Sequence, residues 1–188
     1  MNEYSQKDAL SLADAGERRD FRLKLTSTTV SLTAFSGERL PADGESMPVT
    51  ARFDPRPSVE TQNVESRTLA SIGVDSGRIT LAYDDAIDDD EAPVPTKLSF
   101  DVAEPGLVTL ERSGFMRTVM IFEAGKRHRA IYKTPLGAFE MTVFTRSVEN
   151  TLGANGGSLS LDYAVEFRGA AEQKVRLTLE AARIGASR

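Results

Sequence analysis

Short segments of alternating apolar and polar residues fill most of this chain, and turn sequences of a few residues separate them. Near the C-terminus, Leu159, Leu161 and Tyr163 alternate with Ser160 and Asp162. A period of two is typical of β-strands with one dry and one wet face. The joints, among them DSG, AEPG, AGK and GANGG, are too short to hold crossover helices. The pattern therefore predicts an antiparallel, mostly up-and-down sheet.

The number of such segments indicates how the sheet is arranged in space. A first strand is predicted from Phe21, and from Val64 onward the alternation brings the total to about eight to ten strands. A sheet with so many strands usually curls and closes, because closure removes the exposed edges. We therefore expect an all-β fold, a single closed antiparallel β-barrel, rather than a two-sheet sandwich.

The 188 residues fit one domain with irregular additions. Residues 1–19 show no sustained pattern, so we expect a flexible N-terminal arm, with the barrel over residues 20–188. Within the barrel, residues 36–62 are rich in proline, glycine and charge, and proline prevents a regular ladder. We expect a long Pro-rich insertion there. Its prolines are Pro41, Pro48, Pro55 and Pro57.

Composition narrows the classes of function. The chain contains no cysteine, which removes thiol nucleophiles, thiolate zinc sites and disulfides and suits a reducing cytoplasm. The formal net charge of −5 argues against nucleic-acid binding, which needs a basic surface. The N-terminus lacks the apolar core of a secretory signal, and no run approaches the roughly 18 apolar residues of a membrane span. We expect a cytoplasmic protein that binds neither nucleic acid nor membrane.

Charge is unevenly distributed along the chain. Residues 84–91, DDAIDDDE, are mostly acidic but lack the ligand spacing and central glycine of a calcium loop, so we expect a solvated loop and no metal site. Residues 112–133 contain six basic residues against Glu123 alone. This segment is either a solvated hairpin face or a surface for an acidic partner.

Several motifs between residues 110 and 167 occur in order at short spacings. They are an Arg-x-Gly before a strand, a Tyr-x-Thr-Pro-x-Gly corner, a methionine in the next strand and a Gly-Gly hairpin before a strand with tyrosine: Arg112 and Gly114; Tyr132, Thr134, Pro135 and Gly137; Met141; and Tyr163. Together they resemble the YwiB-like bacterial family of calycin-type β-barrels of unknown function. The resemblance extends from Val64 to the end and is weak over residues 1–63. It implies a calycin-like or lipocalin-like barrel, and it implies no catalytic residue.

The alternation directs a few polar side chains toward the barrel interior. Arg112 is in phase with Val108 and Leu110, and the other inward polar residues follow the same rule. A barrel of about eight to ten strands can hold a small ligand. An apolar interior with one arginine fork and several hydroxyls suits a small apolar or anionic molecule. The candidate ligand-binding residues are Arg112, His128, Tyr132, Tyr163 and Tyr83.

Structural roles for these residues stay open. A core tyrosine usually finds one hydrogen-bond partner, and Arg112 can pair with a carboxylate such as Glu111 or Glu140. Turn chemistry explains the corner at Thr134, Pro135 and Gly137.

An enzymatic role has little support in the sequence. His128 is the single histidine, and no nucleophile elbow, P-loop or zinc-protease motif is present. We expect no cofactor. The alternative to ligand binding is an interaction module that uses the hairpin at residues 115–133 to dock on an acidic partner or a second copy of the chain.

Overall fold

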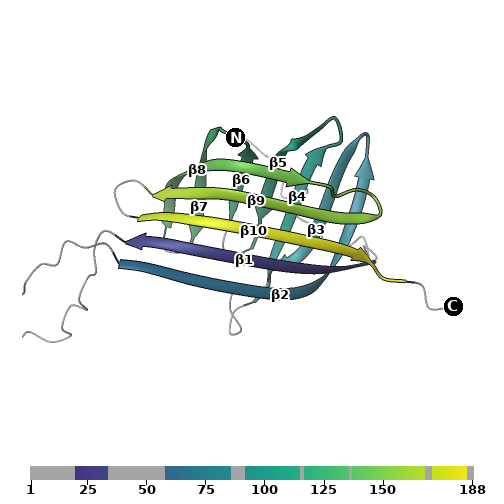
Figure 1. Ribbon diagram of the computed structural model, residues 1–188, viewed down its shortest axis with the longest axis horizontal. Helices are drawn as coiled ribbons and strands as arrows, with labels where there is room; N and C mark the ends of the chain where they lie inside the picture. Colours follow the sequence, from purple (N-terminus) through teal and green to yellow (C-terminus); the bar gives the residue numbers. More distant parts are fainter. Residues whose placement is uncertain are drawn as a thin grey trace, which may run out of the picture.

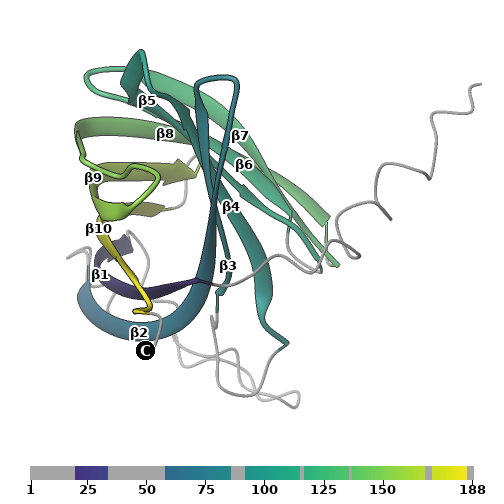
Figure 2. The ribbon, with the colours of Figure 1, turned by 90° about the vertical axis from the view of Figure 1, so that its right-hand side faces the viewer.

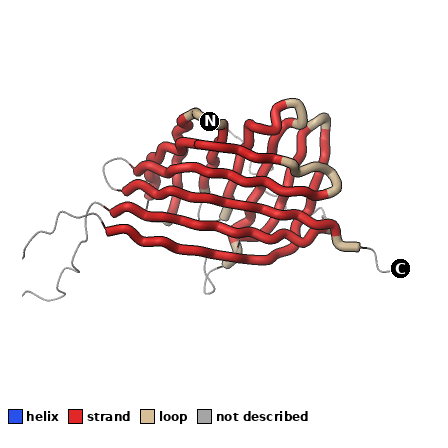
Figure 3. Tube along the Cα trace, in the orientation of Figure 1, coloured by secondary structure: helices blue, strands red, loops and turns tan. Residues whose placement is uncertain are grey.

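The computed structural model describes residues 20–33, 58–85, 92–114, 117–135, 137–167 and 171–185. Every regular element within these ranges is a β-strand (Figure 3), and none of them contains a helix long and apolar enough to cross a membrane. The strands are β1 (Phe21–Thr33), β2 (Ser58–Asp75), β3 (Arg78–Asp85), β4 (Val94–Asp101), β5 (Glu104–Arg112), β6 (Thr118–Glu123), β7 (Arg127–Thr134), β8 (Gly137–Asn150), β9 (Gly156–Phe167) and β10 (Ala171–Arg183).

The strands form one ten-stranded antiparallel sheet in the order β6-β5-β4-β3-β2-β1-β10-β9-β8-β7. Neighbours in sequence are neighbours in the sheet, and β1 pairs with β10, so the predicted up-and-down topology is confirmed. The two edge strands, β6 and β7, meet at an isolated bridge in which Arg117 and Lys133 exchange backbone hydrogen bonds of 2.9 and 2.8 Å. The sheet is thus a nearly closed barrel, with its seam between β6 and β7.

The barrel is flattened into two layers whose strands cross at a steep angle. In Figure 1, β1, β9 and β10 run across the front, while β3 to β7 stand behind them. Strand β2 belongs to both layers: it pairs with β1 up to Ala70 and with β3 from Ala70 onward. Figure 2 shows the bend of β2 from one layer into the other. Both Ala70 and Ser71 are buried at this bend.

The space between the layers is filled mainly by aliphatic side chains on the predicted inner faces. The largest side chains with under 2 % exposure include Phe122, Leu23, Leu81, Leu98, Leu110, Leu159, Leu161 and Leu179. Full burial of one such side chain stabilises the fold by about 1.5–3 kcal/mol relative to exposure. This core holds the inner faces in place, so polar residues in the same phase also point inward.

Two segment boundaries differ from the sequence prediction. Strand β2 begins at Ser58, so residues 58–62 of the predicted insertion lie in a strand, where Gln62 pairs with Thr29 of β1. Likewise β3 extends to Asp85, which pairs with Val94, so the predicted acidic loop starts later. In both places, pairing with a neighbouring strand overrides a polar local composition. The predicted arm at residues 1–19 and the rest of the insertion and acidic loop lie outside the described residues.

Glycine is required at the hairpin that precedes β9. Gly156 and Gly157 have φ values of 101° and 130°, a region that other residues rarely adopt. A Cβ on Gly156 would collide with the carbonyl oxygen of Ala181, and one on Gly157 with that of Thr151. The Gly-Gly hairpin noted in the sequence is therefore a close-approach site that allows β9 to lie against β10.

The corner between β7 and β8 is a tight turn. Thr134 and Gly137 pair directly, and Gly137 has a φ of 144°. The positive φ accounts for the glycine at position 137, and the role of Pro135 in the turn stays a prediction. The side chain of Thr134 lies outside the described part of the structure.

Candidate functional site

Four polar side chains form a row across the inner face of β3, β4, β5 and β6. Strand pairing sets Tyr83 opposite Thr96, Thr96 opposite Arg112, and Arg112 opposite Thr118. Directly opposed residues share a face of the sheet. Tyr83, Thr96 and Thr118 are only 3–4 % exposed. We call these four residues the polar row.

Arg112 forms an ion pair with a residue that the sequence analysis did not consider. Its Nη2 donates to Oδ2 of Asp85 at 2.8 Å, and the two side chains are 27 % and 13 % exposed. Asp85 lies two residues beyond Tyr83 on β3 and so points to the same face. The suggested partners were wrong: Glu111 is exposed, and Glu140 lies 3.6 Å from Arg129 instead.

Two hydrogen-bond donors of the polar row have no partner among the described residues. They are Nε of Arg112 and Oγ1 of Thr118, which lie on adjacent, directly paired strands. By contrast, the hydroxyl of Thr96 donates to the carbonyl of Val94 at 3.0 Å. A buried polar group without a partner costs about 1–3 kcal/mol, and such groups are rare in native proteins. One further buried side-chain atom of the described residues, Oγ1 of Thr145 on β8, also has no partner, but only Nε of Arg112 and Oγ1 of Thr118 belong to the polar row.

Two tyrosines bring neutral hydroxyls to the same region. Tyr83 belongs to the polar row, and Tyr163 reaches it from β9 in the other layer, with its ring 4.8 Å from that of Phe122. Burial raises the pKa of both phenols. The Asp85 carboxylate raises them further, and the Arg112 guanidinium acts in the opposite direction. Both tyrosines therefore stay protonated at neutral pH, next to the ion pair, and their predicted inward orientation is confirmed.

The two candidates on β7 occupy different places. Tyr132 is half-buried and pairs with Phe139, and extending the Arg117–Lys133 bridge by one residue sets Tyr132 opposite Thr118. His128 lies four residues away, about 13 Å along the strand, where its Nε2 is 3.3 Å from Oε2 of Glu123.

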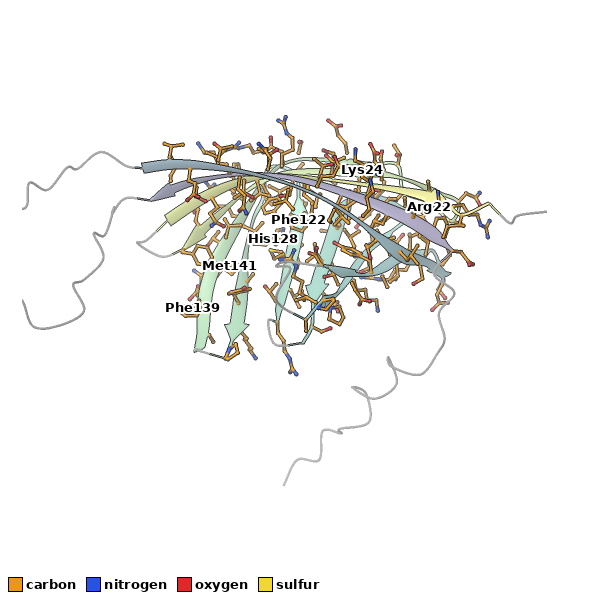
Figure 4. All side chains as sticks on the ribbon, turned by 90° about the horizontal axis from the view of Figure 1, so that it is seen from below. Arg22, Lys24, Phe122, His128, Phe139 and Met141 are labelled. Atoms are coloured by element: carbon orange, nitrogen blue, oxygen red, sulfur yellow. The ribbon has the colours of Figure 1, made fainter. Side chains whose placement is uncertain are left out.

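Figure 4 shows His128, Phe122 and Met141 on the side of their strands that faces the other layer, and Phe139 near the start of β8. Tyr132 thus adjoins the polar row, whereas His128 does not.

Sequence reasoning missed Asp85, Thr96 and Thr118. Alternation alone contained the signal, because Asp85 is in phase with Tyr83, and Thr118 is in phase with Met120. The acidic composition of residues 84–91 concealed Asp85. The described residues include no group of three or more histidine or acidic side chains placed to hold a metal ion.

The outer face of the hairpin formed by β6 and β7 is a second region of interest. Val119 and Ile131 are 51 % and 55 % exposed there. Arg127 of this hairpin has an aromatic and an acidic neighbour: its guanidinium lies over the ring of Phe144 at 4.3 Å and is 3.8 Å from Glu166. A depression of about 380 Å³ lies over β7 and β8 and is lined by Arg129, Ala130, Ile131, Ala138, Phe139 and Glu140.

A second depression, of about 660 Å³, lies over β1, β2 and β10, away from the polar row. Its charged lining residues include Arg22 and Lys24, which flank the buried Leu23 on β1 and therefore belong to the outer face. Neither depression involves a residue of the polar row.

Comparison with known proteins gives two matches. A family model described as "Domain of unknown function (DUF1934)" matches residues 54–179. Among solved structures, the ywiB protein from Bacillus subtilis is similar, with 19 % sequence identity and a TM-score of 0.49 over 86 % of this chain and 93 % of that one. No curated protein matches the chain significantly.

Proposed function

We propose a function from the chemistry of the barrel, because this chain belongs to the DUF1934 family, whose shared domain has no known function. This membership confirms the YwiB-like resemblance of the sequence motifs. The protein binds a small, largely apolar molecule inside the barrel, with the polar head group of that molecule against Arg112 and Thr118. The supporting observation is the pair of buried donors, Nε of Arg112 and Oγ1 of Thr118, without partners among the described residues. A bound molecule that accepts hydrogen bonds from both donors removes the free-energy cost of burying them without partners.

The surroundings of the polar row suit an amphipathic ligand. Tyr163 lies beside the ion pair, and its ring is 4.8 Å from that of Phe122. Met120 is the next inner-face residue after Thr118 on β6. Phe139 is 49 % exposed although it pairs with the inward Tyr132, which fits a rim that a ligand passes. We further propose a calycin-like ligand-binding barrel in the cytoplasm, because the chain has no cysteine.

Native mass spectrometry of the protein purified from its own host tests this function. We expect a small-molecule adduct on the wild-type chain, and we expect Arg112→Leu to lose it. Arg129→Leu is the matched control, because Arg129 is 84 % exposed on the outer face and should retain the adduct. A wild-type chain without any adduct, or with one that survives Arg112→Leu, would contradict the proposal.

A second candidate function is protein interaction through the hairpin at residues 115–133. The exposure of Val119 and Ile131 on its outer face favours it, since exposed apolar groups that cluster often mark interfaces. The partner would be an acidic protein or a second copy of the chain. The pairing of Arg127 with Glu166 and of Arg129 with Glu140 already offsets much of the basic charge, so ligand binding is the better supported of the two.

Light scattering after size exclusion separates the two functions. An interaction module should show a dimer or a complex that Arg127→Glu with Arg129→Glu dissociates. A chain that stays monomeric, and that loses no partner on charge reversal, excludes this second function.

A further inference from the structure

We propose that the barrel selects a ligand whose head group is an uncharged hydrogen-bond acceptor, and that Asp85 is the residue that rejects anions. This inference rests on the proposed function, because it specifies the chemistry of the same ligand. It starts from the 2.8 Å ion pair between Arg112 and Asp85.

The polar row and Asp85 together carry no net charge. Arg112 is the single cation of the row and Asp85 lies directly against it, with side chains 27 % and 13 % exposed. The other members, Tyr83, Thr96 and Thr118, are neutral, and burial keeps the phenols of Tyr83 and Tyr163 protonated. An anion entering this region therefore meets a compensated guanidinium rather than a positive site.

The donors without partners in the described part of the chain, Nε of Arg112 and Oγ1 of Thr118, can nevertheless each bind a hydrogen-bond acceptor on the ligand. The guanidinium has five N–H donors in a fixed fork, of which Asp85 accepts one from Nη2. The N–H of Nε and the hydroxyl of Thr118 have no partner among the described residues. A carbonyl, amide or alcohol oxygen can accept from both and adds no charge to a buried site.

An anionic head group at Nε would share the Arg112 guanidinium with the Asp85 carboxylate, which binds Nη2, and would therefore lie roughly 6 Å or less from that carboxylate. At an effective dielectric constant of about 20, repulsion between two unit charges at that separation weakens binding about a hundredfold. Asp85 is therefore a specificity determinant that acts by charge, separate from the donors that hold the ligand.

Two fluorescent dyes with the same ring system test the inference on the full chain. N-phenyl-1-naphthylamine is neutral, and 1-anilinonaphthalene-8-sulfonate adds one sulfonate. In fluorescence titrations, we expect the wild-type protein to bind the neutral dye at least tenfold more tightly. We expect Asp85→Asn to strengthen binding of the sulfonate by about ten- to a hundredfold and to leave the neutral dye within about threefold.

Asp84→Asn is the matched control. It removes the same charge from the neighbouring residue, which alternation directs to the outer face of β3, and both dyes should bind it as they bind the wild type. Tighter wild-type binding of the sulfonate, or equal effects of the two substitutions, overturns this inference and leaves the proposed function standing. If neither dye binds, both fail. The wild-type preference needs no variant, so the test does not depend on Asp85→Asn folding.

Discussion

Two neighbouring rows of the same four strands differ sharply in chemistry. The polar row consists of Tyr83, Thr96, Arg112 and Thr118. Two residues along each strand, about 6.6 Å away, pairing aligns a second inner-face row: Leu81, Leu98, Leu110 and Met120. The members of this leucine row are 0–6 % exposed. Backbone, register and face are the same in the two rows, so only the side chains distinguish them.

Folding of the barrel explains the side chains of the leucine row but not those of the polar row. Packing satisfies every side chain of the leucine row, because aliphatic groups need only close neighbours. The polar row has an ion pair and two donors without partners among the described residues, which an aliphatic row in its place would avoid. Such a conflict between local chemistry and fold stability is typical of functional sites.

The largest expected effect is in the leucine row. Leu98→Ala, in the middle of the row and 0 % exposed, should lower the free energy of unfolding by about 3–4 kcal/mol, because it opens a cavity between the layers. Urea denaturation measures this. Leu69→Ala, at a residue 46 % exposed, is the control and should change stability by less than about 1 kcal/mol. Equal losses would show that the leucine row is not a close-packed core.

The second largest expected effect is a loss of stability at alkaline pH, caused by two buried tyrosines at the polar row. Because burial raises the pKa of Tyr83 and Tyr163, the folded state retains protons that the unfolded chain releases above about pH 10. Stability should therefore be unaffected below that pH and fall above it, by up to about 1.4 kcal/mol per pH unit for each tyrosine.

Urea denaturation between pH 8 and 11 measures this fall. The double variant Tyr83→Phe with Tyr163→Phe should show a much shallower one. A variant with the same alkaline slope as the wild type would mean that other groups cause it.

The smallest expected effect is a difference in stability between substitutions of two buried threonines in the polar row. Thr96→Val removes a hydroxyl that donates to Val94 and should cost about 1 kcal/mol. Thr118→Val removes a hydroxyl without a partner among the described residues and should leave stability unchanged or raise it slightly. Thermal and urea denaturation of the two variants check this difference. A larger loss at Thr118 would indicate a structural partner for its hydroxyl.

Much of the fold could be predicted from alternation and turn chemistry. A period of two identified the inner faces of β3, β5 and β9, and with them the inward orientation of Tyr83, Arg112 and Tyr163. It worked because these strands carry apolar residues at every second position on one side only. Composition misled where strands end in polar residues, as at the C-terminal end of β3 and the start of β2. The arm predicted at residues 1–19 stays a prediction.

The sequence by itself determined which way the side chains of β3, β5 and β9 point, because in a strand without a bulge that property depends only on position along the strand. It could not determine which inward residues meet. The pairing of Arg112 with Asp85, 27 positions apart, depends on the register of three strands, and the approach of Tyr163 depends on the second layer that the bend in β2 creates. Register and layer packing are set by the whole barrel together, so only the tertiary structure decided that these groups form one site.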